Sequence, residues 1–287
     1  QTGEDIEVIY QVFDINEVML TKIERGHEDF DVVCPSEYII ERMMRKDMLL
    51  PINRDFGKTP DYIPNLAPYI QDELNKMCMD ERKVTDYAVA YMWGTAGVLY
   101  NKALVSEEEA IACSSLWDPK FANKILMKDS YRDCYGLAII YANAERLQKG
   151  EVTVEQLMND NSAEAIATAE EYLKKMKPNI AGWEADFGKE MMTKGKAWMN
   201  FTWSGDAVWS IEEADAVGVE LDYVVPQEGS NVWFDGWVIP KYARNVKAAS
   251  YFINYMCRPD IALRNMDAIG YVSAVATPEI LEAKIDS

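Results

Sequence analysis

Short apolar runs alternate with capped helical segments through the first part of the chain. Residues 6–10 and 30–34 are rich in β-branched and aromatic side chains, which predicts two strands. Residues 16–25 and 36–46 each begin with Asn or Ser, the residue types that commonly cap a helix, and each continues with a helical pattern. This order of strand, helix, strand and helix is typical of a layered α/β domain.

The same signals continue along the rest of the chain. Residues 88–93 and 97–100 predict two strands separated by Gly94-Thr-Ala, and residues 221–225 predict another strand. We expect helices at about 107–112, 135–147, 162–176 and 245–257, and a further helix that Pro259 begins.

Composition limits the classes of partner. The chain has 287 residues and a formal charge of -19, so nucleic acid and anionic membranes are poor partners and cationic ligands are favoured. Acidity also serves solubility, which is the plainer explanation. Hydrophobic residues make up 49% of the sequence, enough for a packed core, and no apolar run is long enough to span a membrane.

The residues that common catalytic and metal sites require are scarce. His27 is the one histidine, and the five cysteines form no C-x-x-C pair, which predicts neither a zinc site nor a disulfide framework. The nucleophile-elbow, zinc-protease and dinucleotide-binding motifs are missing. We therefore expect no cofactor and no metal. A hydrolase that uses two carboxylates remains open, because such acids can be far apart in sequence.

Trp233 and Asp235 lie two residues apart in an extended segment, so both side chains are expected on the same side. An indole face attracts a cation and a carboxylate supplies its counter-charge, a combination that suits an organic ammonium ion. The alternative is a strand with a core tryptophan and a solvated aspartate.

Further aromatic residues stand next to Gly, Ser or Asp at predicted strand ends, where α/β folds place ligands. Together with two acids they predict an aromatic and acidic pocket. Its members would be Tyr38, Trp93, Trp203, Trp233 and Tyr271, with Asp133 and Asp235.

Several segments, in order, resemble motifs of the bacterial polyamine-binding proteins, the spermidine and putrescine receptors of ABC importers. They are DVVCPSEY at 31–38, YMWGTAGVLYN at 91–101, LWDPK at 116–120, WSG at 203–205, WFD at 233–235, FINYMCRPD at 252–260 and IGY at 269–271. The match covers nearly the whole chain. It also implies that the family's N-terminal strand and C-terminal segment lie outside this sequence.

The resemblance implies a two-lobed α/β fold of the type II periplasmic binding proteins, with two hinge crossings and a ligand cleft between the lobes. Lobe one would comprise residues 1–95 and 238–287, and lobe two residues 96–237. A protein of this kind is not an enzyme. It would be a monomer in the periplasm or on the outer face of the cytoplasmic membrane, either free or held by a lipid anchor, and it would pass its polyamine to a membrane permease.

Residue by residue, the resemblance places Asp235 on a terminal ammonium and Asp133 on another amine. Trp203 and Trp233 would flank the alkyl chain, and Ser36, Tyr38 and Tyr271 would line the cleft. Trp93 and Ser130 complete the expected site, although Ser130 stands where the family often has a second acid. A receptor for another small solute and a carboxylate-pair glycan hydrolase are the alternatives.

Overall fold

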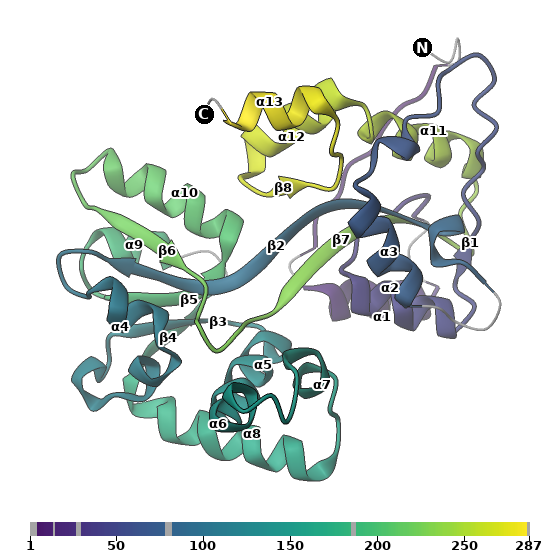
Figure 1. Ribbon diagram of the computed structural model, residues 1–287. Coiled ribbons are helices and arrows are strands. Elements are labelled where there is room, and N and C mark those ends of the chain that lie inside the picture. The colour runs from purple at the N-terminus through teal and green to yellow at the C-terminus, as the bar shows by residue number, and fades with distance from the viewer. Residues whose placement is uncertain (1–4, 14, 27–29, 78–81, 185–187, 286–287) are drawn as a thin grey trace. The chain divides into compact units, whose positions relative to one another are not determined.

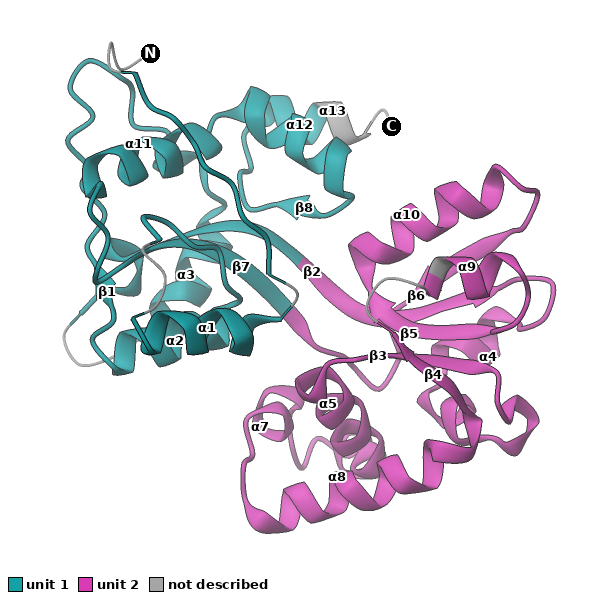
Figure 2. Ribbon diagram, turned by 180° about the vertical axis from the view of Figure 1, so that it is seen from behind, with its two compact units in different colours: residues 1–93, 233–287 teal, residues 94–232 magenta. Residues whose placement is uncertain are grey.

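The computed structural model describes residues 5–13, 15–26, 30–77, 82–184 and 188–285. The chain divides into two compact units, with residues 1–93 and 233–287 in unit 1 and residues 94–232 in unit 2 (Figure 2). Both boundaries fall on long strands, β2 (Ala88–Asn101) and β7 (Val232–Pro240). The boundaries predicted from the sequence, 95/96 and 237/238, fall on the same two strands.

Unit 1 is a small sheet covered by helices (Figure 1). Strand β7 lies between β1 (Leu49–Leu50) and β2, and β8 (Val272–Ser273) pairs antiparallel with the first half of β2. Short 3-10 turns lie at Ile63–Asn65 and Val84–Asp86. The described helices of this unit are α1 (Asn16–Glu24), α2 (Glu37–Arg45), α3 (Pro68–Lys76), α11 (Val246–Met256), α12 (Pro259–Ile269) and α13 (Pro278–Ile285).

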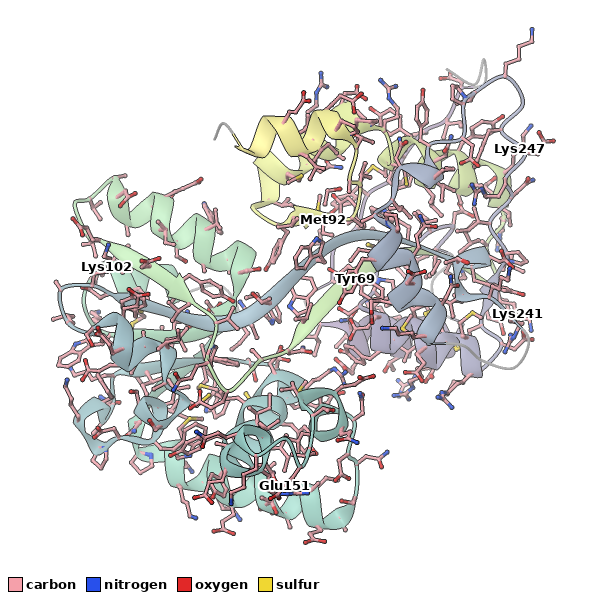
Figure 3. The ribbon with its side chains drawn as sticks, viewed as in Figure 1. Tyr69, Met92, Lys102, Glu151, Lys241 and Lys247 are labelled. Carbon is pink, nitrogen blue, oxygen red and sulfur yellow. The ribbon has the colours of Figure 1, made fainter. Side chains whose placement is uncertain are left out.

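Helix α2 shows why these residues form this unit. Ile40, Met43 and Met44 recur at helical spacing, and all three are buried in one core cluster with Val238 of β7. Met92 of β2, labelled in Figure 3, belongs to the same cluster. This packing fixes the start of α2 against the strand that carries Asp235.

Unit 2 is a sheet in the order β6-β2-β5-β3-β4. Strands β3 (Ile125–Lys128), β4 (Ile180–Glu184) and β5 (Met199–Trp203) are parallel, whereas β2 runs antiparallel to β5 and to β6 (Leu221–Val224). The carboxyl ends of the three parallel strands therefore meet at one edge, the edge at which open α/β sheets usually bind ligands.

Helices follow each of these three strands. The described helices of unit 2 are α4 (Glu107–Ile111), α5 (Tyr131–Ala142), α6 (Ala144–Gln148), α7 (Val154–Met158), α8 (Ala163–Met176), α9 (Gly188–Thr193) and α10 (Ser204–Asp215). The 3-10 turns are Cys113–Trp117, Pro119–Phe121 and Lys177–Asn179. Helices α5, α9 and α10 begin at the carboxyl edge, so their first turns face the strand ends.

Three strand predictions were wrong. Residues 6–10 form no strand, and 30–34 form only one bridge, between Val33 and Val238. A strand needs a neighbour for its backbone groups, and no described strand pairs with residues 6–10. The two strands predicted at 88–93 and 97–100 are one strand, β2. Other strands pair with both of its halves, β8 with the first half and β5 with the second, so the strand continues through Gly94.

The helix predicted at 135–147 was also wrong in its bounds, since α5 begins at Tyr131 and α6 follows after Asn143. The hydroxyl oxygen of Ser130 accepts a hydrogen bond from the backbone N–H of Asp133 and caps α5 earlier than the pattern indicated. Ser162 caps α8 as predicted. Asn16, Ser36 and Asn245 make no side-chain cap, although each lies at the start of a helix.

Candidate ligand-binding site

Asp235 lies on β7 in unit 1, beside the loop that leads into α2. Ser36 and Asp235 form an isolated antiparallel bridge, and Gly236 donates its N–H to the carbonyl of Pro35 over 3.0 Å. Phe234 is buried in the core, whereas Trp233 and Asp235 on either side of it are half-buried. The two side chains therefore share the face opposite to Phe234, as their spacing predicted.

The carboxylate of Asp235 has a hydroxyl partner. Oδ1 accepts a hydrogen bond from Ser36 Oγ over 2.7 Å, and no ion pair to Asp235 is found among the described residues. Burial raises the pKa of Asp235 to about 6, against the lowering effect of the Ser36 hydrogen bond. A half-buried carboxylate that is poorly solvated in this way is stabilised by a cation that arrives from outside.

Ser36 is part of a polar network that α1 supplies. Asn16 donates Nδ2–H to Ser36 Oγ over 2.9 Å and to the hydroxyl of Tyr38 over 3.4 Å. Tyr38 in turn donates its hydroxyl hydrogen to Glu17 Oε1 over 2.8 Å. Asn16 and Glu17 were not singled out in the sequence, where Asn16 was interpreted only as a helix cap.

A second acid lies close to the Asp235 strand. Glu37, the first residue of α2, accepts the backbone N–H of Phe234 at Oε2 over 3.4 Å. Glu17 and Glu37 thus add two carboxylates to the hydrogen-bonded surroundings of Ser36 and β7. The sequence gave no signal for the last two, because an acid in the first turn of a helix is common on any protein surface.

Two aromatic residues of unit 1 are in contact beside the short strand β8, and a third lies on the strand that pairs with it. Trp93 of β2 stands opposite Val272, which follows Tyr271 directly. Tyr271 packs edge-on against Trp233, with ring centroids 5.2 Å apart and an interplanar angle of 66°. Six of the predicted site residues therefore lie in the same unit: Ser36, Tyr38, Trp93, Trp233, Asp235 and Tyr271.

Asp133 lies in unit 2 in the first turn of α5, and it is 6% exposed. Its Oδ1 accepts a hydrogen bond from Asn231 Nδ2 and its Oδ2 accepts one from Trp203 Nε1, each over 2.9 Å. A carboxylate has about four lone-pair positions, so two fixed donors leave capacity for an ammonium group. Ser130, the remaining predicted site residue, caps the same helix.

Lys128 is a feature of this edge that sequence reasoning missed. It is the last residue of β3, its side chain is buried, and its ammonium lies over the ring of Trp203, 4.4 Å from the centroid. Glu184 and Asp206 are its acidic partners. A lysine after the apolar Ile125-Leu-Met127 run resembles an ordinary strand end, so only the fold reveals its position.

The described residues do not hold a group of three or more His, Cys, Asp or Glu that could bind a metal ion. His27 and Cys78 lie outside the described residues, and Cys34, Cys113, Cys134 and Cys257 are free thiols. In the part of the chain that the structure describes, no helix is long and apolar enough to cross a membrane.

A pocket of about 300 Å³ lies elsewhere in unit 1 and contains none of the predicted site residues. Residues of the unpaired N-terminal segment form one of its walls. Its lining consists of Ile6, Val8, Thr59, Tyr62, Tyr251, Phe252, Asn254 and Tyr255.

Comparison with known proteins identifies what this chain is similar to. Residues 1–284 match the family model described as bacterial extracellular solute-binding protein. The spermidine/putrescine-binding periplasmic protein of Salmonella typhimurium is 29% identical over 286 residues, which cover 99% of this chain and 73% of that protein. The putrescine-binding periplasmic protein PotF of Escherichia coli is 29% identical over 289 residues, 97% of this chain and 74% of PotF.

Solved structures are similar over the same length. A putative spermidine/putrescine ABC transporter protein from Listeria monocytogenes superposes with a TM-score of 0.77 at 33% identity, covering 96% of this chain and 79% of that one. The spermidine/putrescine substrate-binding protein PotD of Streptococcus pneumoniae gives a TM-score of 0.71 at 32% identity, covering 94% of this chain and 75% of that one. The fold is that of the type II periplasmic binding proteins.

Proposed function

The chain belongs to the bacterial extracellular solute-binding proteins, and from this membership we propose that it is the polyamine receptor of an ABC importer. It binds putrescine or spermidine outside the cytoplasm, as a monomer, and delivers the polyamine to the membrane permease of the transporter. The family is one of solute-binding proteins, so the carboxylates of the candidate site serve ligand capture and not hydrolysis.

Asp235 is the observation that carries the proposal. It is a carboxylate in a poorly solvated position, its pKa is raised to about 6, and a serine hydroxyl is its hydrogen-bond partner. An ammonium group supplies the missing positive charge. An anion or a neutral sugar would leave that charge uncompensated, which is costly in a poorly solvated position.

Each unit offers an acid and an aromatic ring. In unit 1, Asp235 takes an ammonium while Trp233, packed on Tyr271, covers methylene groups. In unit 2, Asp133 takes an ammonium beside Trp203. Ser36, Tyr38 and Trp93 in unit 1 and Ser130 in unit 2 are the other residues proposed to contact a ligand. An acid beside an aromatic ring matches the chemistry of a polyamine, which is a row of ammonium groups separated by apolar spacers.

Isothermal titration calorimetry with putrescine, spermidine, a neutral sugar and citrate tests the proposal. We expect heat of binding with the amines alone, and about 2.7 kcal/mol of added stability at 100 times the dissociation constant. Asp235→Asn should weaken amine binding by roughly 2–5 kcal/mol, the cost of removing one partner of a buried charge pair. Asp215→Asn, an exposed residue at the end of α10, removes the same charge and should bind normally.

Binding of the sugar or of citrate in place of the amines would contradict the proposal. So would equal affinities of the Asp235→Asn and Asp215→Asn variants, because general acidity would then explain amine binding.

A further inference from the structure

We propose that Asn16 is a positioning residue of the candidate site: its side-chain amide holds Ser36 so that the serine hydroxyl donates its hydrogen to Asp235. The proposed function assigns an ammonium group to Asp235, so the inference rests on that function and adds a residue that acts through another. All three residues lie in unit 1.

Asn16 stands at the start of a helix that is anchored in the core. Met19, Leu20 and Ile23 of α1 are buried, and they belong to the same core cluster as the apolar face of α2. Asn16 precedes Met19 by three positions and Leu20 by four, so its side chain leaves the same face of α1. Helices α1 and α2 lie side by side in unit 1 (Figure 1). The amide of Asn16 therefore reaches the start of α2 from a fixed helix.

Asn16 contacts Ser36 with both ends of its amide. Its Oδ1 accepts the backbone N–H of Ser36 over 3.3 Å, and its Nδ2 donates to Ser36 Oγ over 2.9 Å. A backbone N–H can only donate, so the atom of Asn16 that faces it is the oxygen, and the NH2 group faces the hydroxyl. Tyr38, which Nδ2 also reaches over 3.4 Å, gives its own hydroxyl hydrogen to Glu17 and accepts from Asn16. The partners of the amide thus fix its orientation.

This contact sets the direction of the Ser36 hydroxyl hydrogen. A serine hydroxyl has one hydrogen and accepts at its lone pairs, and Asn16 fills one of the accepting positions. The hydrogen is then directed to Oδ1 of Asp235, which lies 2.7 Å from Ser36 Oγ. A hydroxyl that donates stabilises the ionised carboxylate, whereas a hydroxyl that turns and accepts stabilises the protonated acid. Asn16 therefore favours the form of Asp235 that attracts a cation.

Ser36 has a competing position for its hydroxyl. It is the N-cap residue of α2, yet its side chain makes no cap, and its backbone carbonyl accepts the N–H groups of Ile39 and Ile40. A serine in this place usually bonds the first N–H groups of its own helix. A hydroxyl released by Asn16 is free to turn toward α2, so the loss of Asn16 weakens the hydrogen bond to Asp235.

Other ionisable groups near Asp235 do not replace this donor. Burial raises the pKa of the Cys34 thiol and that of the Tyr91 hydroxyl, so both groups stay neutral at pH 7. Glu37 accepts a backbone N–H of β7, and Glu17 accepts a tyrosine hydroxyl. Ionised carboxylates accept hydrogen bonds and do not donate them. The serine hydroxyl is therefore the donor whose direction matters for Asp235.

The first test is an NMR titration of the Asp235 carboxyl carbon in the ligand-free protein. The wild-type carboxyl should titrate at a pKa of about 6. In Asn16→Ala we expect this pKa to rise by about half a unit to one unit, the range of one net hydrogen bond. This measurement needs no ligand, so it does not depend on the proposed function.

The second test is calorimetry with putrescine at pH 5.5 and pH 8.5. At pH 5.5 the Asn16→Ala variant should bind about threefold to tenfold more weakly, because Asp235 must release a proton that it holds more tightly. At pH 8.5 the carboxyl is ionised in both proteins, so the two affinities should converge. A merely structural role of Asn16 would weaken binding equally at both pH values, and that result would overturn the inference.

A double variant tests whether Asn16 acts through Ser36. Asn16→Ala added to Ser36→Ala should leave the pKa of Asp235 where Ser36→Ala alone places it, because no hydroxyl remains to be oriented. If the shifts from the two substitutions add, Asn16 acts on Asp235 by another route and the inference is wrong.

Asn65 provides the matched control. It is a half-buried asparagine of the same unit, and its Nδ2 donates to the carbonyl of Cys257 over 3.2 Å. Asn65→Ala removes an amide hydrogen bond away from Asp235 and should leave the pKa of that carboxyl unchanged. Circular dichroism melting of each variant establishes that it is folded.

An equal pKa of Asp235 in the wild type and in folded Asn16→Ala would overturn the inference, and amine binding by both proteins would leave the proposed function standing. If the wild type binds neither putrescine nor spermidine, the proposed function fails, and the NMR titration still decides whether Asn16 orients Ser36 toward Asp235.

Discussion

Trp203 donates its Nε1 hydrogen to Oδ2 of Asp133 over 2.9 Å, joining the end of β5 to the first turn of α5 across 70 residues of sequence. Asn231 donates to the other oxygen of the same carboxylate. Asp133 therefore orients an indole and an amide while it presents its negative charge. Its role as a positioning group can be separated from its charge by substitution.

Asp133→Asn should disturb unit 2 more than an ordinary loss of charge. An asparagine offers one oxygen and one NH2 group, so either Trp203 or Asn231 would face a donor instead of an acceptor. We expect a loss of about 1–3 kcal/mol of unfolding free energy in urea denaturation, together with weaker amine binding. Asp215→Asn serves as the control, and equal stabilities of the two variants would contradict the positioning role.

The affinity for a polyamine should depend on pH through Asp235. The ligand-free protein holds this carboxyl at a pKa of about 6, and an ammonium partner stabilises the ionised form. Binding must then release a proton at lower pH, so the dissociation constant should rise by up to about tenfold for each pH unit below 6. Calorimetry at pH 4.5, 5.5, 6.5 and 7.5 measures this slope. A flat profile would mean that Asp235 does not meet the amine.

The stability of the ligand-free protein should show the opposite pH dependence. The pKa of Asp235 is raised in the folded state from an ordinary value of 3.8, so the folded protein binds this proton more tightly than the unfolded chain. The contribution is present below about pH 4 and is lost as pH rises through about 6. Asp235→Asn should therefore be more stable than wild type at pH 7.5 by roughly 1–3 kcal/mol. Urea unfolding at pH 4 and pH 7.5 checks this, and a difference that does not grow with pH would refute it.

Ser36 should tune that pKa. Its hydroxyl donates to Asp235 Oδ1 and lowers the pKa that burial raises. Ser36→Ala removes the hydrogen bond, so the midpoint of the pH-dependent binding should move above 6 and affinity at pH 7 should fall. The matched control is Thr168→Ala, a half-buried residue of α8 whose hydroxyl bonds the carbonyl of Glu164 within its own helix. A midpoint that stays unchanged in Ser36→Ala would contradict the assigned hydrogen bond.

Local patterns predicted local structure. Ser162 caps α8, and Gly26 has the positive φ of 64° that a helix end requires after α1. The spacing of Trp233 and Asp235 predicted that their side chains share one face of β7, a relationship that depends on neighbouring residues alone. The order of such elements indicated an α/β class, although residues 6–10 and 30–34 form no strand, and the two-lobed type II fold was implied by the resemblance of the motifs.

Features that depend on distant partners could not be predicted in this way. Ser36 looked like a helix cap, but its hydroxyl bonds Asp235, which lies 199 residues away in sequence. Residues 6–10 have the composition of a strand and lack a described strand to pair with. Lys128 gave no signal at all, because its ion pairs depend on two acids brought to it by other strands and helices.

Gly97 should be the glycine that tolerates substitution least on β2. A Cβ there would lie 2.5 Å from Tyr223 Cζ and 2.6 Å from the carbonyl oxygen of Val224, and backbone of the paired strand β6 cannot move aside easily. Tyr223 is further held by a hydrogen bond from its hydroxyl to the carbonyl of Thr95 over 3.0 Å. We expect Gly97→Ala to lose about 3 kcal/mol of unfolding free energy, the upper part of the range for overpacking.

Gly236→Ala on β7 is the comparison that isolates this effect. Its Cβ would meet the terminal Cδ1 of Ile40 at 2.9 Å and the carbonyl oxygen of Val89 at 3.3 Å, and the end of an isoleucine side chain can shift where a backbone carbonyl cannot. Urea denaturation should therefore rank Gly97→Ala as clearly less stable than Gly236→Ala. If the two variants lose equal stability, or Gly236→Ala loses more, then rigid contact with β6 is not what excludes a side chain at position 97.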